Sequence, residues 1–325
     1  MMLYDEIPSL DLDDFTSGDT TRKQQFVREL GAAFSNIGFV AIKGHGLSEE
    51  RRQQLYRTIE DFFQLPEDIK AKYAHPELNY QRGYTGKRKE TAKGFTKADL
   101  KEFYHVGQEF THAEAEQYPV LKNYPGNDFP DAEVPEFREA TVTTFRTLEQ
   151  AGLALLRAIA IYLELPENYF DDKASFGNSI LRPIHYFPLN PDEVEDGSVR
   201  AAAHGDINLI TLLMGASADG LEVQRLGGKW IPVTALPDQV VVNVGDMLAR
   251  LTNDVLKSTI HRVVNPPREL LSTSRYSIPF FMHPRSEMDL TCLPSCVSAE
   301  NPKQYSDMTA GAFLEERLRE LGLLA

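Results

Sequence analysis

Three residues of this chain have the types and the spacing of a metal site. His204 and Asp206 stand two positions apart, and His261 follows further along the chain. Two imidazoles and one carboxylate are the ligand set of a facial-triad ferrous site, which leaves open positions for O2 and an organic co-substrate. Arg275 and Ser277 then place a guanidinium beside a hydroxyl, as a buried co-substrate carboxylate would need. This pattern predicts an oxygen-activating iron enzyme.

The tripeptide His-x-Asp/Glu is weak support by itself. With 8 His and 48 acidic residues in 325 positions, roughly one such tripeptide is expected by chance, and the chain has three, which begin at His75, His112 and His204. His75 and His112 lie in polar stretches without a strand pattern, so we interpret them as ordinary solvated residues. His204 differs because it opens the apolar segment INLITLLMG.

Strand geometry explains why the spacing matters. In an extended backbone, residues i and i+2 project to the same face, so His204 and Asp206 are expected to point together. The same holds for Arg275 and Ser277, which flank a tyrosine in the strand-like run SRYSIPFFM. Two such pairs, each on a predicted strand, arise by accident much less often than one.

The elements that position these residues change character along the chain. Apolar residues recur at helical spacing in 21–38, 47–64 and 135–165, so the first 165 residues read as mostly helical. From residue 179 onward, short runs rich in β-branched and aromatic residues follow one another: SILRPIHYF, INLITLLMG, LEVQR, KWIPV, QVVVNVG, STIHRVV and SRYSIPFFM. Such runs, separated by turn residues, indicate a sandwich or a closed barrel. Without internal repeats, we expect the helices to brace this β core as one domain.

Charge and composition exclude several classes of partner. The net charge is −14, which opposes the phosphates of nucleic acid and anionic membrane surfaces. No apolar run reaches the roughly 18 residues of a membrane span, and the start lacks the regions of a signal peptide. We therefore predict a cytoplasmic protein without membrane or nucleic-acid partners; nothing in the sequence indicates an oligomeric state.

The chain has two cysteines, Cys292 and Cys296, with Pro294 between them. A zinc site would need further ligands such as a second cysteine pair, and there is none. We predict free thiols, with a disulfide or redox switch as the alternative.

Longer stretches around these residues resemble a known family. AHGDINLITLL, DGLEVQRLGGKWIPVTALPDQVVVNVGDMLARLTNDVLKSTIHRVV and SRYSIPFF are similar to the core of the isopenicillin N synthase-like iron(II)- and 2-oxoglutarate-dependent dioxygenases. IPSLDL, GFVAIKGHGLSEE and RGYTGKRKE look like the family's N-terminal region. The resemblance implies an α+β fold with a double-stranded β-helix (jelly-roll, cupin-like) core braced by N-terminal helices. Residues 1–125 would form the helix-rich region and 126–325 the dioxygenase core of one integrated domain.

The resemblance also implies roles for single residues. His204, Asp206 and His261 would bind Fe(II), while Arg275 and Ser277 would hold the distal carboxylate of 2-oxoglutarate. Iron held by three protein groups keeps two positions for the 2-oxo acid and one for O2. The products would be succinate, CO2 and an oxidised small molecule.

Two further positions are less sharply defined. Phe281 falls where the family often presents a ring to the substrate. In the segment HYFP, the gapless register places Phe187 at the family's co-substrate tyrosine, with Tyr186 beside it. Only one of the two can face the iron, because neighbouring side chains leave opposite faces of a strand. A carboxylate beside Arg275 and Ser277 can accept a third donor, which favours Tyr186.

The substrate itself is not readable, although some contacts can be suggested. Arg82, Tyr84 and Lys87 in QRGYTGKRKE are candidates to reach an anionic small molecule. An apolar pocket must keep water from the oxidant, and candidates for its lining are Ile207, Leu209, Leu213 and Phe281.

Two alternatives to this function stay open. One is an iron oxidase like isopenicillin N synthase, in which Arg275 and Ser277 bind the substrate's own carboxylate and no 2-oxoglutarate is used. The other is a non-catalytic cupin-like binding protein, with His204 and His261 as core histidines. A zinc hydrolase is less favoured, since no acidic general base is recognisable beside the triad. The Arg275 and Ser277 pair favours the oxygenase, because function depends on the site and not on the fold alone.

Overall fold

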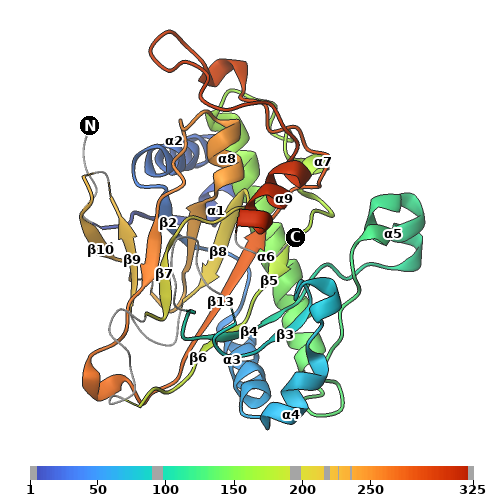
Figure 1. Ribbon diagram of the computed structural model, residues 1–325. Coiled ribbons are helices and arrows are strands. Elements are labelled where there is room, and N and C mark those ends of the chain that lie inside the picture. Colours follow the sequence, from blue (N-terminus) through green and yellow to red (C-terminus); the bar gives the residue numbers. More distant parts are fainter. Residues whose placement is uncertain are drawn as a thin grey trace.

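Two β-sheets and a layer of helices make up the described protein (Figure 1). The structure is a computed structural model, and it describes residues 6–89, 98–190, 199–215, 220–225, 227–234 and 236–320. The larger sheet has the order β1 (Ser9–Asp11), β2 (Phe39–Lys43), β11 (Val240–Val244), β8 (Ile210–Met214), β13 (Arg275–Met282), β6 (Ile184–Tyr186), β4 (Glu102–His105) and β3 (Gly83–Thr85), and β5 (Ile180–Leu181) pairs with β13. The smaller sheet has the order β10 (Trp230–Pro232), β9 (Leu221–Gln224), β12 (His261–Val263) and β7 (Ala201–His204).

The described α-helices include the long ones that the sequence predicts. They are α1 (Leu12–Thr16), α2 (Thr20–Asn36), α3 (Glu49–Phe63), α4 (Glu67–Lys70), α5 (His112–Gln117), α6 (Phe137–Tyr162), α7 (Asp171–Ala174), α8 (Asp246–Leu251) and α9 (Ala310–Glu320). The predicted helices at 21–38, 47–64 and 135–165 correspond to α2, α3 and α6. Helix α2 begins where the side chain of Asp19 accepts hydrogen bonds from the backbone of the first turn, which is the usual way to satisfy those amides.

Strand alternation divides the apolar residues between two layers. On β8, Leu212 and Met214 belong to the cluster that packs on the helices, and Leu213 packs against the cluster between the sheets. Phe145 of α6 contacts Phe280 of β13 at a centroid distance of 4.9 Å, which ties this helix to the larger sheet. The inter-sheet cluster draws residues from both sheets: Phe39, Phe103, Ile184, Tyr186 and Val241 from the larger one, and Ala201, Leu221, Val223, Ile231 and Val263 from the smaller one. The expected α+β architecture with a jelly-roll core is confirmed.

The structure corrects the sequence analysis at three places. The first 165 residues are not only helical, because they supply β1 to β4, and β2 pairs with β11 while β4 pairs with β6. Strand β7 was not predicted, since alanines carry little strand propensity. His204 ends β7 in the smaller sheet, whereas the apolar run after it forms β8 in the larger sheet, so Asp206 lies in the connection between sheets. The boundary at residue 125 stays a prediction.

Two further expectations from the sequence concern membrane spans and the state of the cysteines. None of the helices in the described ranges has the length and apolarity to cross a membrane. The cytoplasmic location stays a prediction. Cys292 and Cys296 are both buried free thiols, as predicted.

Candidate metal and co-substrate site

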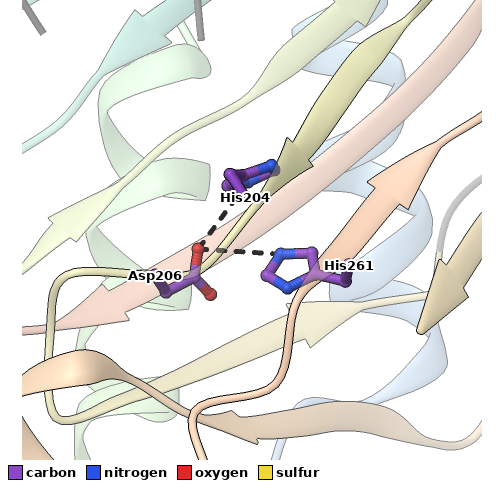
Figure 2. Close-up of side chains that lie close together, drawn as sticks. All are labelled: His204, Asp206 and His261. Carbon is purple, nitrogen blue, oxygen red and sulfur yellow. Dashed lines mark ion pairs between the residues drawn. The ribbon is translucent and has the colours of Figure 1, made fainter. Parts of the chain in front are cut away.

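The three proposed metal ligands come together at the open edge of the smaller sheet. His204 and His261 are register partners on β7 and β12, and Asp206 lies two residues after the end of β7. Nε2 of His204 lies 3.9 Å, and Nε2 of His261 3.7 Å, from Oδ1 of Asp206. Figure 2 shows both rings approaching the carboxylate from neighbouring strands. One donor atom from each residue lies within 4.8 Å of the others, and no second such group occurs among the described residues.

Each imidazole is oriented by a hydrogen bond on its far side. Nδ1 of His204 lies 2.7 Å from the carbonyl oxygen of Ala202, and Nδ1 of His261 lies 3.2 Å from that of Thr259. A carbonyl oxygen only accepts, so each Nδ1 carries the hydrogen. This leaves both Nε2 lone pairs directed toward Asp206, and such a fixed tautomer is typical of metal-binding histidines.

Asp206 is held in the same way. Thr211 Oγ1 donates to its Oδ2 at 2.6 Å, and Asn243 Nδ2 donates to the same oxygen at 2.8 Å. Burial raises the pKa of Asp206, but the charge of the imidazoles of His261 and His204 when they are protonated, together with the two hydrogen bonds, outweighs burial and lowers that pKa. With neutral imidazoles, the hydrogen bonds from Asn243 and Thr211 are the contacts that favour the ionised carboxylate. The carboxylate is therefore ionised, with Oδ1 left for a metal.

The donor set fits a ferrous ion. Two neutral nitrogens and one carboxylate oxygen, with no thiolate, are the ligands of the facial triad. The side chain of His204 is 40% exposed, against 11% for His261 and 5% for Asp206. The carboxylate and His261 thus lie deep in the site, and His204 lies near its mouth.

The residues expected at the co-substrate lie on the inner face of two paired strands. Arg275 on β13 is the register partner of Tyr186 on β6, and its guanidinium carbon lies 4.9 Å from the centroid of the Tyr186 ring. Arg275, Ser277 and Tyr186 are all buried. Phe187 packs into a separate small cluster formed with Leu100, Leu189 and Leu271. Of the two candidates in HYFP, Tyr186 faces the space between the sheets.

A second buried guanidinium lies beside this group, and the sequence analysis missed it. Arg200 is 1% exposed, and its guanidinium carbon lies 5.9 Å from the Tyr186 ring centroid. Its Nη2 donates to the carbonyl of Thr273 at 3.1 Å, and no described residue forms an ion pair with it. Burial, and then the charge of Arg275, lower the pKa of Arg200 to about 10. The polar stretch EDGSVR carried no signal that this arginine would be buried.

Phe281 lies beside a residue that contacts a proposed metal ligand, and its contact with substrate stays a prediction. It is the register partner of Thr211, which donates to Asp206. The guanidinium carbon of Arg182 lies 4.9 Å from the Phe281 centroid and 4.6 Å from that of Phe103. A cation therefore stands beside the ring at which substrate was expected, and it too was missed from the sequence.

The structure does not bring Arg82, Tyr84 and Lys87 to the triad. The hydroxyl of Tyr84 donates to Glu102 and Glu67, and its ring packs with the helices, away from the space between the sheets. Arg82 is 1% exposed and is not a solvated loop residue. Nζ of Lys87 lies 2.7 Å from Glu67. Arg82, Tyr84 and Lys87 therefore make contacts within the protein, and their contact with a substrate stays a prediction.

The expected apolar lining is only partly in place. Leu213 and Phe281 lie on the inner face of the larger sheet. Ile207 and Leu209 pack into the cluster on the helix side instead. The reason is that both residues precede β8, in the connection between sheets, where strand alternation does not apply.

Comparisons with known proteins agree with this geometry. Residues 7–132 match the non-haem dioxygenase in morphine synthesis N-terminal family, and residues 178–284 match the 2OG-Fe(II) oxygenase superfamily. The chain is 35% identical to proline hydroxylase buaE of Petromyces alliaceus, over 96% of this chain and 98% of that protein.

Two solved structures show the same fold. A 2OG-Fe(II) oxygenase family protein from Caulobacter crescentus is 40% identical, covers 97% of this chain and 99% of its own, and superposes with a TM-score of 0.84. A full-length Neurospora crassa protein in complex with alpha-KG and thymine is 30% identical, with 96% of each chain covered and a TM-score of 0.84. The chain therefore belongs to the 2OG-Fe(II) oxygenase superfamily, in its isopenicillin N synthase-like group, and is an oxidoreductase that uses Fe(II) and 2-oxoglutarate.

Proposed function

We propose that His204, Asp206 and His261 hold the Fe(II) of this enzyme. One observation carries this assignment. In each ligand one atom (Nδ1 of the two histidines, Oδ2 of Asp206) is hydrogen-bonded to a neighbour, and the other donor atoms lie close enough together to share a metal ion. When bound, iron and co-substrate supply O2 activation coupled to oxidative decarboxylation, with succinate and CO2 as products. The protein's part is to present three donors and keep the opposite positions open.

The distal carboxylate of 2-oxoglutarate binds, in this proposal, where two buried guanidiniums flank Tyr186. Arg275 can bind a carboxylate with two parallel hydrogen bonds, and the hydroxyls of Ser277 and Tyr186 can each donate one more. Arg200 adds a second positive charge, and burying it without an ionic partner among the described residues costs free energy. A dianionic co-substrate would offset that cost.

We infer further that the substrate is a small anionic molecule that stacks on Phe281 near Arg182. Arg182 stands between the rings of Phe281 and Phe103, and such a planar cation suits a carboxylate or another acceptor group. Related proteins support the size class: the Neurospora crassa protein was solved with thymine and with 5-formyluracil, and the relative buaE is named a proline hydroxylase.

Metal content tests the ligand assignment. Purified wild-type protein should bind one Fe(II) per chain, and His204→Ala or His261→Ala should lose both metal and turnover, because two remaining donors hold iron poorly. His75→Ala and His112→Ala are matched controls and should keep their iron. Stoichiometric iron in His261→Ala, measured by elemental analysis, would remove the triad assignment.

Substrate class is tested by succinate release against paired compounds. Amino acids, small peptides and phenolic or pyrimidine acids are each compared with the neutral amide of the same molecule. The proposal expects turnover for an acid and little for its amide, with the difference lost in Arg182→Gln. Equal turnover of both members of every active pair would exclude an anionic substrate.

The oxidase that dispenses with 2-oxoglutarate is not favoured. The argument for it was a phenylalanine in place of the co-substrate tyrosine, but Phe187 packs elsewhere and Tyr186 lies beside Arg275. Anaerobic addition of 2-oxoglutarate to the Fe(II) protein should give the weak visible band of a chelated 2-oxo acid. Absence of both this band and succinate release would restore the oxidase.

A further inference from the structure

A row of three side chains crosses the back of the strands that carry the co-substrate residues. Glu102 on β4, His185 on β6 and Tyr276 on β13 are register partners. They lie on the face turned toward the helices, whereas the residues on either side of Tyr276, Arg275 and Ser277, lie on the inner face. This row therefore lies directly behind the proposed carboxylate site.

The row begins in a buried ion pair with the N-terminal region. Glu102 is 0% exposed, and its Oε2 accepts from Nζ of Lys70, at the end of α4, at 2.8 Å and from the hydroxyl of Tyr84. Lys70 is itself 1% exposed. A buried ion pair of this kind adds little stability compared with apolar packing, because desolvation opposes the attraction. Its clearer consequence is a fixed position for the Glu102 carboxylate.

That carboxylate orients His185, and His185 in turn contacts β13. Oε1 of Glu102 lies 2.8 Å from Nδ1 of His185, and since a carboxylate only accepts, this nitrogen carries the hydrogen. The other nitrogen, Nε2, lies 3.0 Å from Oγ of Ser274. The ring is stacked on Tyr276, with centroids 4.8 Å apart and planes at 13°. His185 thus contacts the residues on both sides of Arg275, Ser274 just before β13 and Tyr276 on it.

We propose that Glu102, acting through His185, is a positioning residue for 2-oxoglutarate. His185 precedes Tyr186 on β6, and Ser274 immediately precedes Arg275, the first residue of β13. Fixing His185 against Ser274 therefore also fixes Tyr186 against Arg275. The carboxylate site then forms with Tyr186 and Arg275 already aligned, which lowers the ordering cost of binding. This inference rests on the proposed role of Arg275 in holding the co-substrate.

The test compares Glu102→Gln and Ser274→Ala with wild type. Both should raise the Kd of 2-oxoglutarate about fivefold to tenfold, the effect of one hydrogen bond in a positioned site. The Kd is measured on the anaerobic Fe(II) protein from the visible band, and again on the metal-free protein by ligand-observed NMR. The second measurement isolates the distal carboxylate, because no chelation contributes. Fe(II) affinity, and kcat at saturating 2-oxoglutarate, should change less than about twofold.

Thr144→Ala is the matched control for Ser274→Ala. Thr144 is a buried hydroxyl on α6 that bonds only to the carbonyl of Ala140, so its removal costs a hydrogen bond away from both strands. It should lower the melting temperature but leave the Kd of 2-oxoglutarate unchanged. If Glu102→Gln fails to fold, because Lys70 keeps only its longer ion pair with the more exposed Glu67, Ser274→Ala decides the matter.

Arg275→Leu separates failure of this inference from failure of the proposed function. If Arg275→Leu leaves the Kd unchanged, the co-substrate assignment itself is wrong. If it weakens binding while Glu102→Gln and Ser274→Ala keep the wild-type Kd, only the positioning role is wrong. A parallel loss of iron affinity, kcat and co-substrate binding in both variants would mean general damage to the fold and would equally overturn the positioning role.

Discussion

Arg275 and Tyr186 are register partners on neighbouring strands, with the guanidinium carbon 4.9 Å from the centroid of the phenol ring. The cation thus rests near the face of the ring, and both side chains face the space between the two sheets. A carboxylate bound by Arg275 would lie near the Tyr186 ring, whose hydroxyl can donate a hydrogen bond to it. This relationship underlies the first prediction.

Tyr186→Phe should raise the Kd of 2-oxoglutarate about tenfold, since one hydrogen bond to a buried carboxylate is lost while the ring remains. Phe187→Tyr should be nearly silent, because Phe187 packs in a different cluster. Anaerobic titration of the visible band measures both. A silent Tyr186→Phe would show that the hydroxyl does not contact the co-substrate.

Arg200→Gln should have opposite effects on binding and on stability. The affinity for 2-oxoglutarate should fall about tenfold or more as a charge-assisted partner is lost. The fold lowers the pKa of Arg200 to about 10, below its unfolded value, so the charged form is disfavoured in the folded state at neutral pH. Without ligand, the variant should therefore melt at a higher temperature than wild type. Unchanged affinity together with a lower melting temperature would give Arg200 a purely structural role.

Asn243→Ala and Thr211→Ala should each weaken Fe(II) binding by about tenfold to a hundredfold. Both residues donate to the Oδ2 of Asp206, and removing one frees the carboxylate to rotate away from the metal. Competitive titration with a colorimetric chelator measures the affinity. Thr252→Ala is a control, because this buried hydroxyl bonds to backbone groups of α8 and of the turn that follows it. Wild-type iron affinity in both test variants would contradict this role.

Glu149 on α6 should make the protein less stable as the pH rises. Burial raises the pKa of this carboxyl to about 7, from 4.5 in the unfolded chain. Between those values the folded protein keeps a proton that the unfolded chain has lost, so stability falls as pH rises toward 7 and the full penalty is present above it. Glu149→Gln should match wild type near pH 4 and melt at a higher temperature at pH 8. Glu139→Gln, which changes an exposed carboxylate on the same helix, is the control and should show no such difference.

The residues for chemistry were predictable because their types and short spacings limit what they can do. Two histidines and an aspartate are a ligand set wherever they meet, and Arg275 with Ser277 at i and i+2 on one strand must share a face. The strands from residue 179 onward were predictable for the same local reason, since the patterns of β8, β11 and β13 lie within single runs of sequence.

Contacts between distant segments were decided only by the tertiary structure. Register across β6 and β13 determines that Tyr186, and not Phe187, lies beside Arg275. Burial of Arg200 depends on what packs around it, which a polar stretch of sequence does not reveal. The sequence by itself thus determined which groups could bind a metal, because their chemistry is local. The tertiary structure decided which neighbours orient these groups and which charged side chains lie beside them. Strand pairing and burial bring these residues together although they are far apart in the chain.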